Sequence, residues 1–248
     1  MTKFFVGVAA LFWSMSSWAA ACNVDLANEV QITGQSVAIV KSDGSKATIA
    51  ADDRLSVNGK NVPLNQEQKA GLDRYRQQVS QYAPTIKQFI SHNLDFADGI
   101  VDEVSKSMGV PGAFDRFKQS MRTFAGDIQS HYYQGDSLVL PANTFESAKK
   151  QWPVYYGKAK SLFDTEFVNQ AFDVMSSKMS QNGGINLTEF SNQVSALKKQ
   201  VETQLSTHSN QLKQQGQKMC QSLYDLKGEE QALQEHIPEL KGYNIFKK

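Results

Sequence analysis

The chain alternates apolar and polar residues with a period of two near its start and changes to a helical period further on. Between residues 22 and 64 the alternation of β-branched and polar side chains is typical of short strands. Asn58-Gly59 lies between Leu55 and Val57 on one side and Val62 on the other, and this dipeptide strongly favours a tight hairpin. We therefore expect a small antiparallel β-meander over residues 22–64.

From residue 66 the apolar positions recur at the spacing of an α-helix. The first stripe takes ten steps over 36 residues, from Leu72 to Met108, so it stays on one face of a straight helix. Asn65 predicts the N-cap, because Gln68 three residues later can complete a capping box. Pro84 predicts a kink rather than a break, and Gly109 ends the helix.

Three further helical patterns predict helices over residues 114–132, 142–179 and 187–227. Pro153 could divide the second of these into two helices. The connector over residues 135–141 contains Leu138-Val139-Leu140, which could add a short extended piece. Gly228 ends the last long helix, and a short helix from Glu229 to His236 follows.

These patterns predict an α+β fold that is mainly α. A small N-terminal antiparallel β-meander is followed by three or four long amphipathic helices. We expect the long-helix region, residues 65–227, to pack as one domain with the sheet. Residues 228–248 are expected to form a short helix and a tail.

The first 21 residues have the composition of a secretory signal peptide. Lys3 supplies a positive start, an uncharged apolar stretch runs from Phe4 to Trp13, and small residues gather up to Ala21. Cleavage before Ala20 and cleavage before Cys22 are both open. No later segment has the roughly 20 uncharged apolar residues of a membrane helix. We expect an exported, periplasmic protein without a transmembrane span.

The charge of the chain gives no sign of a polyanionic partner. It has 26 Lys and Arg residues and 25 Asp and Glu residues, and loss of Lys3 with the leader leaves 25 of each sign. Neither sign forms a long block. We therefore expect no nucleic-acid partner and no electrostatic attraction to an anionic membrane.

Cys22 and Cys220 are the only cysteines. Two thiols in an exported chain most often form one disulfide, and closing a loop of this length would stabilise the fold by roughly 5 kcal/mol. Two alternatives stay open. A redox pair usually has Cys-x-x-Cys spacing, which these residues lack. A lipid anchor on Cys22 would normally follow a leucine three residues earlier, where Ala19 stands.

The histidines do not predict a metal site. His92, His131, His208 and His236 show none of the spacings of a zinc site. His131 stands beside two tyrosines and could bind a ligand, but packing at a helix end is the simpler interpretation. His208 lies on the apolar stripe of the last helix, and we interpret it as a core histidine with a hydrogen-bond partner.

Other motifs for catalysis, metals or cofactors are also missing. The chain has no Gly-x-Ser-x-Gly elbow, and Gly183-Gly184 lacks the lysine that follows glycine in a phosphate loop. Residues 178–189 have the length of a calcium loop, but Lys178 replaces its leading carboxylate. Adjacent carboxylates are interpreted as solvated surface, because neighbours in a helix or strand point in different directions. They are Asp52-Asp53, Asp102-Glu103 and Glu229-Glu230.

Several residues between the hairpin and the last helix form a diffuse pattern. They are Asn58-Gly59-Lys60, Leu64, Tyr75, Pro84, Met108-Gly109 and Cys220. On these residues the chain resembles the YggN-like family of exported proteins from Gram-negative bacteria, a family without an assigned activity. The resemblance implies a periplasmic location and the disulfide, and it supplies no substrate or catalytic residue.

Binding rather than catalysis is the function that these observations favour. We expect a non-enzymatic binding or envelope-accessory protein that meets an envelope protein or an unfolded client through its long helices. An aromatic run in the third helical region is interpreted as core, with an apolar groove as the alternative. It consists of Trp152, Tyr155, Tyr156, Phe163, Phe167 and Phe172. Two other functions stay open: an envelope hydrolase with a carboxylate-based site, and a lipoprotein anchored at Cys22.

Overall fold

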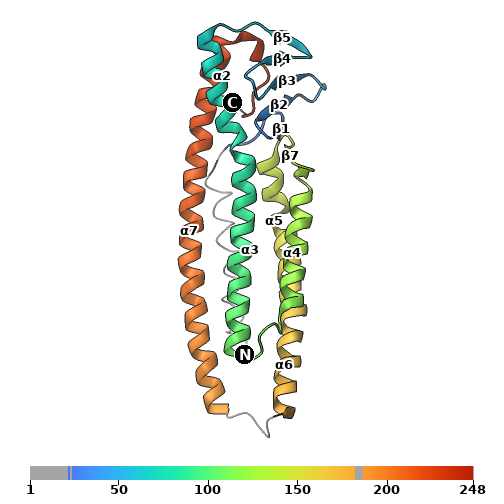
Figure 1. The fold of residues 1–248 in the computed structure, drawn as a ribbon, viewed down its shortest axis with the longest axis vertical. Coiled ribbons are helices and arrows are strands. Elements are labelled where there is room, and N and C mark those ends of the chain that lie inside the picture. The colour runs from blue at the N-terminus through green and yellow to red at the C-terminus, as the bar shows by residue number, and fades with distance from the viewer. Residues whose placement is uncertain (1–21, 23, 182–186, 248) are drawn as a thin grey trace. The chain divides into compact units, whose positions relative to one another are not determined.

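The computed structural model describes residues 22, 24–181 and 187–247, and it confirms an α+β fold that is mainly helical (Figure 1). The predicted leader and the Gly183-Gly184 turn lie outside these residues. The chain divides into two compact units, each built from separate stretches. The sheet unit takes the described residues of Ala19–Phe89, Ile128–Lys150 and Gly216–Lys248. The helical unit takes Ile90–Asp127 and the described residues of Gln151–Gln215.

One antiparallel sheet of seven strands, in the order β5-β4-β3-β2-β1-β7-β6, forms the base of the sheet unit. The strands are β1 Glu29–Thr33, β2 Ser36–Val40, β3 Lys46–Ile49, β4 Leu55–Val57, β5 Lys60–Val62, β6 Tyr133–Gln134 and β7 Ser137–Leu140. β1 to β5 form the predicted meander, and Asn58 and Gly59 turn between β4 and β5 with positive φ. The extended piece predicted after the second helix is β7, which pairs with β1.

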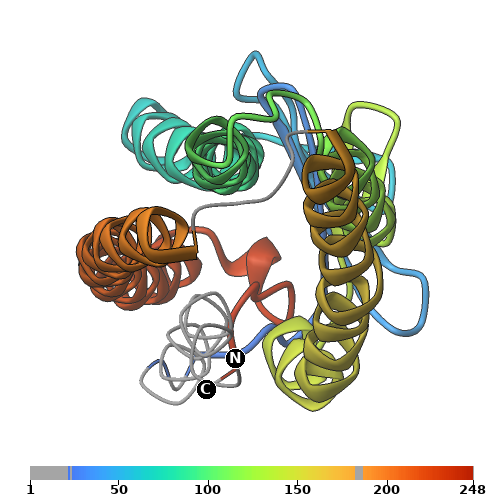
Figure 2. The same ribbon diagram turned by 90° about the horizontal axis from the view of Figure 1, so that it is seen from below.

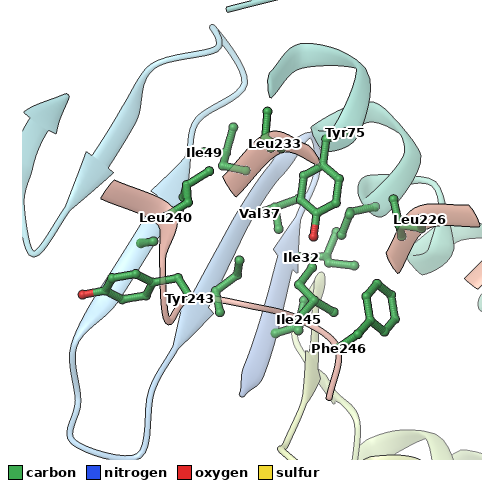
Figure 3. Packing of buried hydrophobic residues seen from close by; sticks show 14 of the residues in the cluster. Ile32, Val37, Ile49, Tyr75, Leu226, Leu233, Leu240, Tyr243, Ile245 and Phe246 are labelled. Carbon is green, nitrogen blue, oxygen red and sulfur yellow. The ribbon is translucent and has the colours of Figure 1, made fainter. Parts of the chain in front are cut away.

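The alternating apolar residues of the strands point into one core (Figure 3). Helix α2 (Gln66–Ser80), the end of α7 (Leu187–His236) and the C-terminal segment complete that core. Its buried side chains include Ile32, Val37, Ile49, Leu72, Tyr75, Leu226, Leu233, Leu240, Ile245 and Phe246. Segments from both ends of the sequence therefore share one hydrophobic core.

The helix predicted from residue 66 to residue 108 is two helices, α2 and α3 (Tyr82–Ser107). Gln81 between them keeps helical backbone angles, with φ at −67° and ψ at −18°, so the interruption is a kink, as predicted, and not a break. Pro84 has no N–H for the carbonyl of Ser80, the last residue of α2, and its ring crowds that carbonyl. The predicted start is confirmed, because Asn65 and Gln68 form a reciprocal capping box with N···O distances of 2.9 Å.

The remaining helices also differ from the prediction at their ends. Helix α4 covers Asp115–Ser130, and α5 (Thr144–Leu162) continues through a π-helical turn (Phe163–Phe167) into α6 (Val168–Gln181). Pro153 lies inside α5 and does not divide it. Figures 1 and 2 show α5 and α6 following one another along the chain.

Helix α7 runs through Gly228 to His236, so the predicted end at Gly228 was wrong. A glycine inside a helix costs only about 1 kcal/mol. The buried apolar side chains of Leu226 and Leu233 on either side offset that cost. The short helix expected after Gly228 is therefore the last part of α7.

In the helical unit, α3 packs on two sides. Ile100 contacts Val201 and Leu205 of α7. Val101 lies in a second cluster with Phe114, Phe117 and the π-helical turn. No described helix is long and apolar enough to cross a membrane.

A disulfide joins Cys22 and Cys220 in the sheet unit. Their Cα atoms are 5.5 Å apart, and their sequence separation is 198 residues. The pairing expected from the sequence is thus present in the structure. It ties the residue that precedes the sheet to the part of α7 that packs on the sheet.

Candidate functional site

A cavity of about 520 Å³ lies in the sheet unit between the β4–β5 hairpin and the start of α2. Its wall is partly apolar and partly charged. It is lined by Asp52, Asp53, Arg54, Leu55, Asn61, Val62, Pro63, Leu64, Lys69, Ala70 and Asp73. The capping box at Asn65 fixes where α2 begins, and so fixes the helical side of the cavity.

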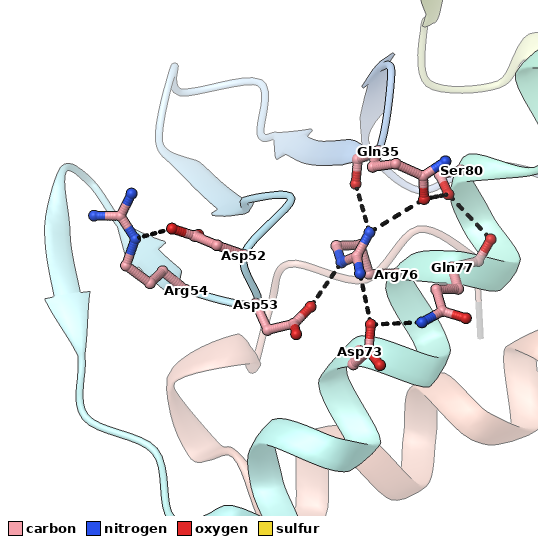
Figure 4. Close-up of polar contacts among 8 residues, drawn as sticks. All are labelled: Gln35, Asp52, Asp53, Arg54, Asp73, Arg76, Gln77 and Ser80. Atoms are coloured by element: carbon pink, nitrogen blue, oxygen red, sulfur yellow. Dashed lines mark hydrogen bonds and ion pairs between the residues drawn. The ribbon is translucent and has the colours of Figure 1, made fainter.

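Arg76 of α2 binds two aspartates of the cavity wall, Asp53 and Asp73 (Figure 4). Its side chain is 6% exposed. Its Nε donates to Asp53 Oδ1 at 2.9 Å, and its Nη2 donates to Asp73 Oδ1 at 2.5 Å. Its Nη1 donates to the carbonyl oxygen of Gln35 at 3.0 Å. A planar guanidinium can satisfy these acceptors together, and the network fixes both aspartates at the cavity wall.

Asp53 occupies an unusual backbone position, with φ at 62°. Aspartate tolerates this left-handed region better than most side chains, because it is short and polar. The turn is closed by Asp53 N–H, which donates to the Ala50 carbonyl at 3.0 Å. Tight turning after β3 thus brings the carboxylate of Asp53 to Arg76.

Two carboxylates of the cavity wall, Asp52 and Asp73, favour their ionised forms. A hydrogen bond from Gln77 and the nearby Arg76 guanidinium hold the pKa of Asp73 below its ordinary value, against the effect of burial. Hydrogen bonding from Arg54, 2.7 Å away, likewise lowers the pKa of Asp52. Such carboxylates accept protons or hydrogen bonds from a ligand, and a general acid would need a raised pKa.

A buried carboxylate lies deeper in the sheet unit. Glu230 is 4% exposed, which corrects its interpretation as solvated surface. It accepts hydrogen bonds from the Tyr75 hydroxyl at 2.7 Å and from the backbone N–H groups of Ile245 at 2.5 Å and Phe246 at 3.2 Å. Burial raises the pKa of Glu230 despite these donors. This carboxylate anchors the C-terminal segment and does not line the cavity.

Three of the other adjacent carboxylates behave as interpreted, whereas Glu103 is half-buried and accepts hydrogen bonds from Gln200 and Gln204 of α7. Asp52, Asp102 and Glu229 are exposed. Asp102 accepts from Lys118 at 2.6 Å, and Glu229 accepts from Gln78 at 3.0 Å. Asp53 differs, because folding places it next to Asp73 of another element. Within the described residues, no group of three or more His, Cys, Asp or Glu side chains could hold a metal ion.

The histidine interpretations are confirmed for the core. His208 is 5% exposed and its Nε2 lies 2.9 Å from Asn93 Oδ1. His92, His131 and His236 are exposed. Tyr132 and Tyr133, which follow His131, pack against the main core, and the Tyr133 hydroxyl donates to the Ala83 carbonyl at 2.8 Å.

The aromatic run of α5 and α6 divides into a packed part and an exposed part. Phe163 and Phe167 stack on each other, with ring centroids 4.9 Å apart, and Phe114 stacks on Phe167 at 4.6 Å. Phe172 is 72% exposed and Val154 is 59% exposed. The interpretation of the run as core therefore holds for Phe163 and Phe167 and is wrong for Phe172.

Sequence reasoning missed Arg76 and Glu230, although each left a signal. Arg76 stands four residues after Leu72 and so lies on the buried face of α2. Glu230 stands four residues after Leu226 and three before Leu233, on the apolar stripe of α7. Because the predicted helix ends at Gly228, Glu230 falls outside the predicted apolar stripe.

Comparison with known proteins gives a family but no activity. No curated protein and no solved structure matches the chain. A family model described as a protein of unknown function (DUF2884) matches residues 22–246. The match covers most of the chain, and the chain therefore belongs to this family of unknown function.

Proposed function

We propose that the mature protein is an exported, non-enzymatic binding protein of the cell envelope, which holds a partner protein or an unfolded client against α5 and α6. The leader, the resemblance to YggN-like proteins and the disulfide support a periplasmic location. A disulfide persists in that compartment and rarely in the cytosol.

The observation that carries the binding role is the exposed Phe172. Large aromatic side chains rarely stand in water at 72% exposure, and they are enriched at the centres of protein interfaces. Asn169, Asp173 and Ser176, which lie close to it on α6, are exposed and polar. The π-helical turn precedes α6, and such turns are frequent at functional sites.

Site-specific photocrosslinking tests this role in cells. A photoreactive phenylalanine analogue at position 172 should capture a defined envelope protein or a set of unfolded clients. The same analogue at Asn169, an exposed polar position on α6, should capture much less. Equal capture at both positions would show that Phe172 is not a contact.

Aggregation suppression gives a second readout with purified protein. The mature protein should slow the aggregation of an unfolded outer-membrane protein, and Phe172→Ser should weaken this effect with the fold unchanged. Failure to suppress aggregation together with failure to capture a partner would reject the binding role.

An envelope hydrolase is the second candidate function, and the cavity beside α2 favours it. That cavity has three aspartates in its wall, one of them with a left-handed backbone. The lowered pKa of Asp73 keeps its carboxylate ionised at neutral pH, and an ionised carboxylate can accept a proton but cannot supply one. Incubation with purified peptidoglycan should release soluble fragments under this proposal, and Asp73→Asn should abolish that release.

The disulfide argues against the alternative of a lipid anchor on Cys22. A lipoprotein carries its diacylglycerol on the cysteine sulfur, and that sulfur in Cys22 is bonded to Cys220. We propose that Cys22 is not acylated. Mass spectrometry of the mature N-terminus should give an unmodified mass, and a lipid-shifted mass would reverse this assignment.

A further inference from the structure

His208 is a polar ring within the apolar contact between α3 and α7 of the helical unit. On α7 it follows Val201 and Leu205 and precedes Leu212 at spacings of four, three and four residues. All four side chains are buried. The apolar stripe of α7 that packs against α3 thus contains one ionisable side chain, the imidazole of His208.

Three of the partners of His208 come from one turn of α3. Its ring lies parallel to that of Phe96, with centroids 3.7 Å apart and an interplanar angle of 13°. Its Nε2 lies 2.9 Å from Asn93 Oδ1, so Nε2 carries the proton in the neutral tautomer that forms this bond. The ring of His92 lies 6.1 Å away. The single side chain of His208 thus makes several contacts between α7 and α3.

The surroundings of His208 favour its neutral form. Burial lowers its pKa most, the charge of His92 lowers it further, and a hydrogen bond with Gln211 opposes both. His92 of α3 is the charged group that acts on it among the described residues. Glu103 of α3 lies further along the contact, where it accepts from Gln200 and Gln204 of α7.

We propose that His208 is a proton-sensitive latch that holds α7 against α3. In its neutral form the ring fills the contact and donates to Asn93. Protonation would place a cation in the apolar stripe next to His92, and the contact of Ile100 with Val201 and Leu205 would loosen with it. This latch is a property of the helix pair and does not depend on the partner binding proposed above.

The direction of the pH effect follows from the lowered pKa. The folded chain binds fewer protons at His208 than the unfolded chain does. The helix contact is therefore fully stable above about pH 6.5, the ordinary value for histidine. It weakens as the pH falls from there toward the lower pKa of folded His208.

NMR titration of the histidine ring carbons in the full mature protein tests the first step. The midpoint of His208 should lie below about 6.5, the ordinary value for histidine. A midpoint at or above that value would show that the folded protein does not disfavour the cation, and it would overturn the proposal.

Hydrogen exchange tests the second step. After correction for the intrinsic pH dependence of exchange, the opening of α7 amides over residues 201–212 should increase between pH 7.5 and pH 5.5. The increase should reach at most about tenfold, because only one pH unit of this range lies below the ordinary histidine value of about 6.5. His208→Gln should remove this pH dependence, and His236→Gln should leave it unchanged. Equal pH dependence in wild type and His208→Gln would overturn the latch, and the NMR titration decides the matter if that variant does not fold.

Discussion

At the scale of single residues, the sheet unit is organised around two charged side chains that fold away from water. Arg76 lies between two aspartates and the carbonyl of Gln35, and Glu230 accepts three hydrogen bonds. A buried charge with partners fixes local geometry more than it adds stability, because desolvation opposes the attraction. In the sequence each residue shows only as a charged position on an apolar face. Their partners come from distant segments, so no local pattern could have predicted them.

Glu230 gives a pH-dependent prediction. Its pKa is raised chiefly by burial, so the folded chain holds its proton more tightly than the unfolded chain does. The free energy of unfolding should therefore fall as the pH rises from about 4.5 through the raised pKa. Glu230→Gln should flatten this part of the profile, which denaturant titrations between pH 4.5 and pH 7 would measure. A profile with the same slope in both proteins would contradict the assignment.

At the scale of elements, the periodic patterns predicted which segments are helices and strands, and the helix ends were harder to predict. Pro84 lies at the kink between α2 and α3, whereas Pro153 lies inside α5 and Gly228 lies inside α7. Local rules give the stability that a helix loses when it contains a proline or a glycine, which is a few kcal/mol at most. Whether the helix continues depends on the packing on either side. At Gly228 that packing is a core formed by the other end of the chain.

The glycines of α7 and of the hairpin should respond in opposite ways to alanine. A Cβ at Gly228 would meet no atom within 4 Å, so Gly228→Ala should stabilise the fold by about 1 kcal/mol. Gly59 has φ at 78°, where a side chain is strained, so Gly59→Ala should destabilise it by about 1 kcal/mol. Thermal unfolding of the two variants beside wild type would measure both shifts. A loss of stability in Gly228→Ala would show that α7 is strained at this point.

Phe167 of the π-helical turn and Phe172 of α6 are two phenylalanines of which one is packed and the other is exposed. Phe167→Ala removes a ring that stacks on Phe114 and Phe163 and should cost about 3 kcal/mol. Phe172→Ala removes an exposed ring and should change stability by less than about 0.5 kcal/mol. Chemical denaturation would measure both. A large loss in Phe172→Ala would mean that this ring is packed in the folded protein, and the binding proposal would lose its support.

At the scale of the whole molecule, the sheet was the least predictable feature. The sequence predicts a meander, and β1 to β5 form one, but β6 and β7 extend the same sheet from a segment about 100 residues later. Pairing of β1 with β7 depends on Val30 and Ile32 meeting Leu140 and Leu138. Such non-local pairs leave no periodic signal at either strand. The cavity beside α2 was unpredictable for the same reason, since its wall joins a turn, a hairpin and a helix.

The disulfide should make a large contribution to the stability of the whole chain. It closes a loop with a sequence separation of 198 residues, and loss of that constraint should lower the free energy of unfolding by up to about 5 kcal/mol. Denaturant titrations of Cys220→Ser, and of wild type with a reducing agent, should show the same lowered midpoint. The double variant with Cys22→Ser should fall no further. A reductant-insensitive wild type would show that the two thiols are not bonded in solution.

The C-terminal segment has a consequence for the order in which the protein can be made. Ile245 and Phe246 lie in the same core as the first strands, Phe246 forms a β-bridge with Leu26, and the Ala27 N–H donates to the Ile245 carbonyl. A ribosome delivers Ile245 and Phe246 long after the meander. The part of the core that these two residues share with the first strands therefore cannot form until residue 246 has left the ribosome.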